Sequence, residues 1–169
     1  MVVDEGLGMR LSGVGMIALT VWLLRYDIAL MTIRRSGLPQ FVAACLISGY
    51  IWLGVSGAVI LLSEPMFAGF SYDAYLHAVL LGFVFSMVFG HAPIIFPAVM
   101  ERPIGFTPFA YVPLAVLHFS VALRILADLA GIQTVRQAAG VWTGVAIVLY
   151  GAFIVYGLMR GDSRSWDSR

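Results

Sequence analysis

The sequence has little charge, and it contains no lysine and no asparagine. Only 11% of its 169 residues are charged, whereas 61% are hydrophobic. Soluble domains carry about 25% charged and about 45–50% apolar residues, so this chain has too few charges to cover a surface that faces water. A formal net charge of +1 also excludes the basic surface that nucleic-acid binding needs. These shortages predict an integral membrane protein, with the lipid bilayer as its main partner.

Cysteine is nearly missing as well. The single cysteine, Cys45, lies within an apolar run, which excludes an intramolecular disulfide and a cysteine-based metal cluster. The HxH, HxxE and HExxH spacings that mark a compact metal site are also absent from the sequence. Ligand chemistry must therefore be sought in isolated side chains inside the apolar segments.

Five hydrophobic segments approach or exceed the roughly 20 residues that cross a bilayer as a helix. They cover residues 7–24, 39–62, 72–99, 108–130 and 134–159. The first is the weakest, because it contains Arg10 and three glycines. We predict an all-α, polytopic membrane helical bundle of about five transmembrane helices. It forms one domain over residues 1–169, and residues 161–169 are expected to be a flexible polar tail.

Arginine placement predicts the orientation, because cytoplasmic loops carry an excess of basic residues. Three arginines fall between the first and second segments, one between the third and fourth, and three in the C-terminal tail. These are Arg25, Arg34, Arg35, Arg102, Arg160, Arg164 and Arg169. The loops on the other side hold Arg136 alone. The N-terminus is therefore predicted outside and the C-terminus inside.

All three histidines, His77, His91 and His118, fall within predicted spans. An ionisable residue at membrane depth usually faces protein or a cavity, and it marks a candidate functional site. His77 and His91 are 14 residues apart, so on an α-helix they share one face and lie about 21 Å apart along the axis. They cannot share one metal ion, but each could hold a haem, and His118 could be the opposite axial ligand to either. Each histidine could instead hydrogen-bond a hydroxyl group on a neighbouring helix.

The third span also carries packing signals. Gly82, Ser86 and Gly90 form a seam of small residues opposite His77, which favours the close approach of another helix. Pro93 and Pro97 lack the N–H group that a helix needs, so they predict a kinked or broken end with freed carbonyl groups near His91.

Arg124 is the arginine that lies well inside a predicted span, and its charge needs an anionic partner there. Asp128, four residues on, can form an i,i+4 ion pair with it. Arg124 could instead bind the propionates of a haem held by His77, because Asp73 and His77 begin the third span at a similar depth. Both alternatives stay open at this point.

The stretch HAVLLGFVFSMVFGHAP, from His77 to Pro93, resembles histidine-bearing helices of the NnrS family. Residues 24–27 and 49–53 add to a likeness that covers residues 20–131. NnrS proteins are haem- and copper-containing membrane proteins linked to nitric-oxide stress and denitrification, similar in outline to heme–copper oxidase subunit I.

The resemblance implies haem b in a multi-pass protein of the bacterial inner membrane. By this resemblance, the ligands of the haem or metal would be His77, His91 and His118. The chain is shorter than typical family members, so it could be a reduced relative or half of a homodimer within a larger membrane complex. Because it has three histidines, a full haem-plus-copper centre within one chain is not expected.

Two functions are therefore compared. The first is a haem- or metal-binding membrane protein that takes part in nitric-oxide chemistry, denitrification or respiratory electron transfer. The second is a non-catalytic accessory subunit, an assembly factor or a small transporter. The absorption spectrum of the purified protein separates them.

Overall fold

The computed structural model describes residues 5–64, 68–101 and 105–160, which are almost entirely helical. No strand occurs within these ranges, so the predicted all-α class is confirmed. Five helical runs among them are long and apolar enough to cross a membrane. They are Gly6–Tyr26, Leu38–Leu62, Phe70–Met100, Pro108–Ala130 and Gln133–Met159. These runs match the five predicted segments to within a few residues at their ends, including the weak first one, and their insertion in a membrane stays a prediction. The polar tail at residues 161–169 lies outside the described residues.

The elements follow one another with short connections. The first part of the chain forms α1 (Glu5–Tyr26), the short α2 (Ala29–Thr32) and α3 (Leu38–Leu62). The third span has three parts, α4 (Phe70–His77), the π-helical segment η1 (Ala78–Val84) and α5 (Phe85–Met100). A 3-10 turn, η2 (Pro108–Ala110), leads into α6 (Tyr111–Ala130) and α7 (Gln133–Arg160).

The turn between α6 and α7 depends on a glycine. Gly131 has a φ of 67°, a left-handed conformation that residues with a Cβ rarely adopt. It ends α6 and allows α7 to begin at Gln133, so the two helices run back along each other.

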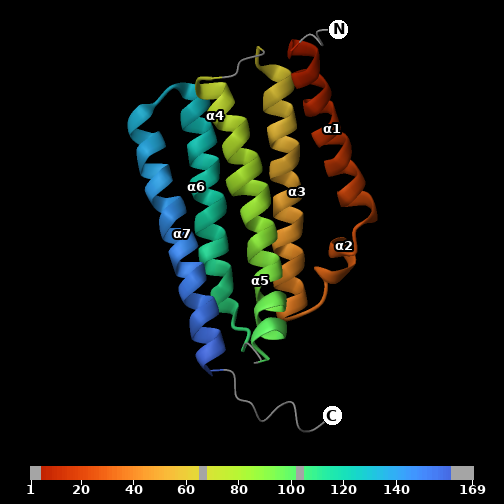
Figure 1. The fold of residues 1–169 in the computed structure, drawn as a ribbon, viewed down its shortest axis with the longest axis vertical. Helices are drawn as coiled ribbons and strands as arrows, with labels where there is room; N and C mark the ends of the chain where they lie inside the picture. Colours follow the sequence, from red (N-terminus) through yellow and green to blue (C-terminus); the bar gives the residue numbers. More distant parts are fainter. Residues whose placement is uncertain (1–4, 65–67, 102–104, 161–169) are drawn as a thin grey trace.

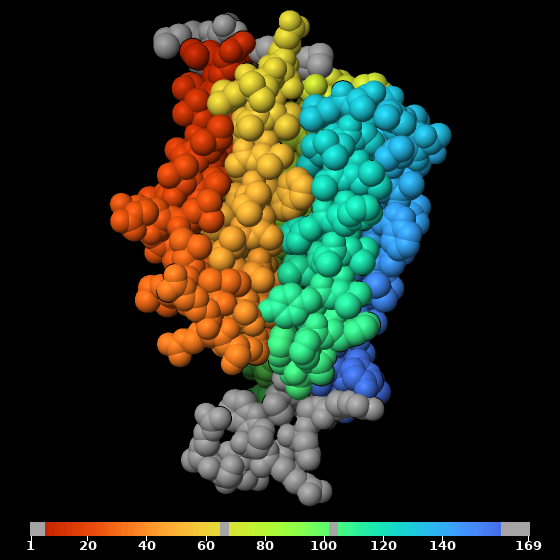
Figure 2. Space-filling view, turned by 180° about the vertical axis from the view of Figure 1, so that it is seen from behind, coloured from red at the N-terminus to blue at the C-terminus, as the bar shows by residue number. Residues whose placement is uncertain are grey.

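The long helices lie side by side in the order α1, α3, α4–α5, α6 and α7 (Figure 1). Figure 2, seen from behind, shows α1, α3, α6 and α7 and hides most of α5, which therefore lies on the side seen in Figure 1. α1 begins at one end of the bundle and α7 finishes at the other (Figure 1). This arrangement agrees with termini on opposite sides of a membrane, while the N-out orientation stays a prediction.

Small residues mark the closest helix contacts. A Cβ atom on Gly57 of α3 would lie 2.7 Å from the carbonyl oxygen of Gly13 of α1. Gly82, Ser86 and Gly90 are all buried, and the two glycines lie against α3. The predicted seam is therefore confirmed, with α3 as the helix that approaches it.

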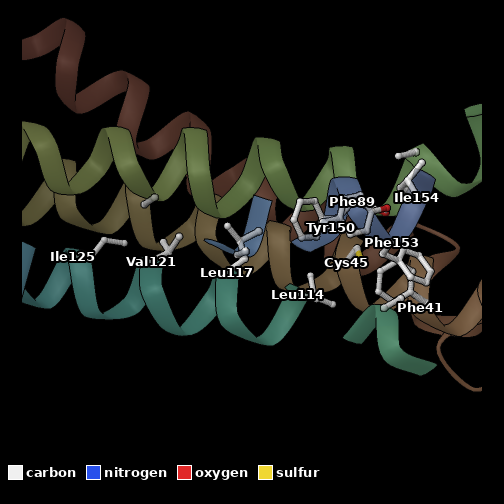
Figure 3. Close-up of a cluster of buried hydrophobic side chains, with 14 of the residues drawn as sticks. Phe41, Cys45, Phe89, Leu114, Leu117, Val121, Ile125, Tyr150, Phe153 and Ile154 are labelled. Carbon is white, nitrogen blue, oxygen red and sulfur yellow. The ribbon is translucent and has the colours of Figure 1, made fainter. Parts of the chain in front are cut away.

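A buried cluster of apolar side chains joins α3, α5, α6 and α7 (Figure 3). Within it, the rings of Phe89 and Tyr150 are stacked with their centroids 3.7 Å apart. The Tyr150 hydroxyl donates a hydrogen bond to the carbonyl oxygen of Phe89. This carbonyl lies four residues before Pro93, which has no N–H to donate to it. The predicted freed carbonyl thus exists, but α5 continues through both prolines to Met100, so the predicted break is absent.

Candidate functional site

Polar side chains gather at three places in the bundle. The ion cluster comprises Asp73, Arg124, Asp128 and Arg136 and joins α4, α6 and α7 at the end where α1 begins. The indole–imidazole pair is Trp52 of α3 with His118 of α6. The His91 hollow lies on the exposed side of α5.

Asp128 is the centre of the ion cluster, and its side chain is fully buried. The Nε of Arg124 lies 3.2 Å from both of its carboxylate oxygens, and the Nε of Arg136 donates to Oδ1. Arg136 also donates to the carboxylate of Asp73, and its guanidinium lies 4.6 Å from the ring centroid of Phe70. Two cations and two anions therefore offset each other, which allows the charges to be buried.

The predicted Arg124–Asp128 pair is thus confirmed. The sequence analysis placed Arg136 in a loop. In the structure it lies in the first turn of α7 and forms ion pairs with both Asp73 and Asp128. The available signal was its position eight residues after Asp128, across a tight turn marked by Gly131. Nη1 of Arg124 donates to the Arg136 carbonyl oxygen at 3.3 Å. The role of Arg124 toward haem propionates stays a prediction.

His77 and His91 make the same hydrogen bond. In each, Nδ1 lies close to the carbonyl oxygen four residues earlier, 2.6 Å from that of Asp73 and 2.7 Å from that of Met87. A carbonyl can only accept, so each Nδ1 carries the proton, and in the neutral imidazole Nε2 then has a free lone pair. Histidines that bind a metal are typically oriented by such a second hydrogen bond.

The two histidines do not lie in equivalent surroundings. His77 is half-buried, whereas His91 is exposed. The predicted shared face assumed a regular α-helix, but η1 separates the two residues. Each residue of a π-helix turns the chain through a smaller angle, so α5 is rotated relative to α4. The prediction that both histidines face the bundle interior is therefore wrong for His91.

His91 borders a hollow of about 350 Å³ on the surface of α5. The other lining residues are Met87, Val88, Ala92, Ile95 and Phe96. The hollow is thus an apolar surface with one imidazole. Ligand sites commonly have this composition, in which a few polar groups fix the orientation of an otherwise apolar molecule.

His118 is the other tautomer of the neutral imidazole, with its proton on Nε2. The indole Nε1–H of Trp52 donates to Nδ1 of His118 at 2.8 Å, and the two rings are inclined by 18°. Nδ1 therefore carries the lone pair and Nε2 carries the proton. Nε2 is buried and has no hydrogen-bond partner in the part of the chain that the structure describes. His118 thus offers a buried proton rather than a free lone pair, which does not fit the axial-ligand role expected for it.

The sequence analysis did not single out Trp52. It lies in the middle of α3, and its indole packs against Gly82 of η1. The π-helical segment, Trp52 and His118 are therefore one connected unit across α3, the third span and α6.

We expect the substitution Gly82→Ala to lower the free energy of unfolding by about 1–3 kcal/mol, because the new methyl group would overlap the Trp52 indole. Chemical unfolding in detergent measures this. Gly15→Ala is the matched control, since a Cβ on Gly15 of α1 would meet open space. Equal stability of the two variants would contradict the close packing of Trp52 on Gly82.

Within the described ranges, no group of three or more His, Cys, Asp or Glu side chains could hold a metal ion. The geometry instead offers single histidines, His77 and His91, each with a lone pair on Nε2.

Comparison with known proteins gives one match. A family model described as "Domain of unknown function (DUF8744)" matches residues 1–159. No curated protein and no solved structure matches the chain. The resemblance to the NnrS family therefore stays a prediction.

Proposed function

The chain belongs to the DUF8744 family, and we propose that it is a multi-pass protein of the bacterial inner membrane that binds haem b through histidine. The observation that carries the proposal is the His91 hollow. Its apolar walls suit a flat hydrophobic macrocycle, and the hydrogen bond from His91 Nδ1 to the Met87 carbonyl orients the ring and leaves Nε2 for the iron.

The residues of the chain contribute binding and electrostatics. Haem, when bound, supplies an iron that takes up one electron or binds a diatomic gas. The apolar lining of the hollow disfavours extra charge on the iron, which tunes its reduction potential. Such a site suits respiratory electron transfer or the handling of nitric oxide.

His77 is the second candidate ligand. Its imidazole is oriented by the Asp73 carbonyl, and the Asp73 carboxylate is held by Arg136. Arg124 and Arg136 would place positive charge near the propionates of a haem on His77. His118 is left out of the ligand set, because Trp52 occupies its Nδ1 and the proton is on Nε2.

We expect protein purified in detergent from haem-replete cells to show a Soret band that shifts on reduction, and His91→Ala to abolish or strongly weaken it. His118→Ala is the matched control. It should keep the band, since His118 is not proposed as a ligand. Absorption spectra and a haem assay of the variants measure this.

Two results would count against the proposal. An unchanged spectrum in His91→Ala would remove His91 from the site. A colourless wild-type preparation from haem-replete cells would reject haem binding altogether. The accessory subunit, assembly factor or small transporter then becomes the better account.

A further inference from the structure

We infer that the Nη2 group of Arg124 binds the phosphate of a membrane phospholipid. The site lies where α6 meets α7, at the end of the bundle where α1 begins (Figure 1). The inference uses the membrane location proposed above, but it does not depend on haem. Four features of the structure carry it.

The first feature is a pair of N–H groups without an acceptor. Nε of Arg124 donates to Asp128, and Nη1 donates to the carbonyl oxygen of Arg136. Nη2 carries two further N–H groups, which have no partner among the described residues. Nη2 is not enclosed either, because the unpaired side-chain atom that is fully enclosed in the described ranges is Nε2 of His118. An acceptor from outside the chain can therefore reach Nη2.

The second feature is the charge around Arg124. Among the described residues, its anionic partner is Asp128, and Arg136 shares that carboxylate. The carboxylate of Asp73 pairs with Arg136. One negative charge divided between two guanidinium groups leaves Arg124 incompletely neutralised. Its free N–H groups therefore favour an anion over a neutral acceptor such as water, since hydrogen bonds between charged groups are the stronger ones.

The third feature is depth. Arg124 bonds Asp128, which lies two residues before the end of α6 at Ala130, so its guanidinium is within about one helical turn of that end. The run Pro108–Ala130 has 23 residues and measures about 34 Å, whereas the hydrocarbon core of a bilayer is about 30 Å thick. In a membrane, the guanidinium thus lies where acyl chains meet headgroups. The anion that phospholipids carry at this level is the phosphate.

The fourth feature is a missing side chain beside the guanidinium. Gly140 of α7 is exposed, and a Cβ atom there would lie 3.8 Å from Nη1 of Arg124. Glycine leaves this side of the guanidinium uncovered, so a phosphate oxygen has room to approach. A longer side chain at the same position would reach across that room.

The test is a cross-linking titration of the full chain in dodecyl maltoside, a detergent without phosphate. The probe is phosphatidylglycerol with a photoreactive headgroup, and mass spectrometry measures its attachment to residues 124–144. We expect Gly140→Leu to raise the half-saturating probe concentration about tenfold, the size of effect that follows the loss of a hydrogen bond to a charged group. This substitution leaves the four charged side chains of the ion cluster in place.

Gly144→Leu is the matched control. Gly144 lies one turn farther along α7 and is also exposed, and a Cβ atom on it would meet open space. We expect its half-saturating concentration to stay within about twofold of the wild-type value. Attachment of the probe to residues 25–39, at the opposite end of the bundle, is the internal reference and should be equal in all variants.

Arg124→Gln removes the donor itself and should weaken attachment at residues 124–144 as much as Gly140→Leu does. Circular dichroism establishes that both variants are folded. Competitors then identify the source of the anion. Unlabelled phosphatidylglycerol should displace the probe, whereas diacylglycerol with the same acyl chains and inorganic phosphate should not.

Four results would overturn the inference. Unchanged titration of Gly140→Leu would remove the site, and equal competition by diacylglycerol would show that acyl chains hold the lipid. Displacement by inorganic phosphate would assign the site to the free ion. Loss of haem from Gly140→Leu with unchanged cross-linking would assign Arg124 to a haem propionate. The haem spectrum of the wild type tests the proposed function separately, so the two can fail independently.

Discussion

Replacing Asp128 by asparagine is expected to lower the free energy of unfolding by about 3–5 kcal/mol, because it removes one partner from a buried group of charges. The carboxylate is fully buried and accepts from both Arg124 and Arg136. Asparagine keeps the size of the side chain but leaves two guanidinium groups with Asp73 as their remaining anion in the cluster. Thermal or chemical unfolding in detergent measures the loss.

Asp73→Asn is the matched control for this experiment. It makes the same chemical change within the same cluster, but the side chain of Asp73 is 37% exposed and, among the described residues, pairs with one arginine, Arg136. Exposed ion pairs contribute little, so we expect a loss of less than about 1 kcal/mol. Equal losses in the two variants would contradict the assignment of Asp128 as the buried centre of the cluster.

The second large effect is expected for Phe89→Ala, which should lower the free energy of unfolding by about 3–5 kcal/mol. Phe89 is 1% exposed, and its ring stacks on Tyr150 inside the core. Its removal leaves a cavity among α3, α5 and α7 and takes away the surface that positions the Tyr150 hydroxyl at the Phe89 carbonyl. Unfolding in detergent again provides the measurement.

Phe119→Ala separates loss of packing from loss of an aromatic ring as such. Phe119 of α6 is 67% exposed, so its truncation leaves no enclosed cavity. We expect a change within about 0.5 kcal/mol. If Phe119→Ala were as damaging as Phe89→Ala, the cluster of Figure 3 would not be the stabilising core.

The helices could be predicted because the signals for them are local. A run of about 20 apolar residues identifies a span without knowledge of its neighbours. For the same reason the pair of Arg124 with Asp128 was predictable, since one helical turn joins them. The seam at Gly82, Ser86 and Gly90 needed the helical period alone.

The rest of the candidate site depends on contacts between distant segments. Trp52 and His118 are 66 residues apart, and no sequence pattern links an indole to an imidazole on another helix. Arg136 joins the cluster because α7 begins at Gln133 and turns its first residues toward α4 and α6. The predicted direction of the His91 side chain was wrong because η1 rotates the helix that follows it. A π-helical segment has no reliable sequence signature, so this rotation could not be predicted.

The π-helical segment Ala78–Val84 has a consequence for how relatives of this chain should be aligned. A wide turn of this kind holds more residues than an α-helix needs for the same length. A relative with one residue fewer in this region could keep both ends of the span in place and form an unbroken α-helix. Its residues equivalent to Phe85 and beyond would then face the same neighbours as they do here. A relative of the same length with a regular α-helix would instead have those residues turned by about 100° relative to the ones before Ala78. A single-residue gap within Ala78–Val84 would therefore mark relatives that keep the direction of the histidine equivalent to His91 without the π-helical segment.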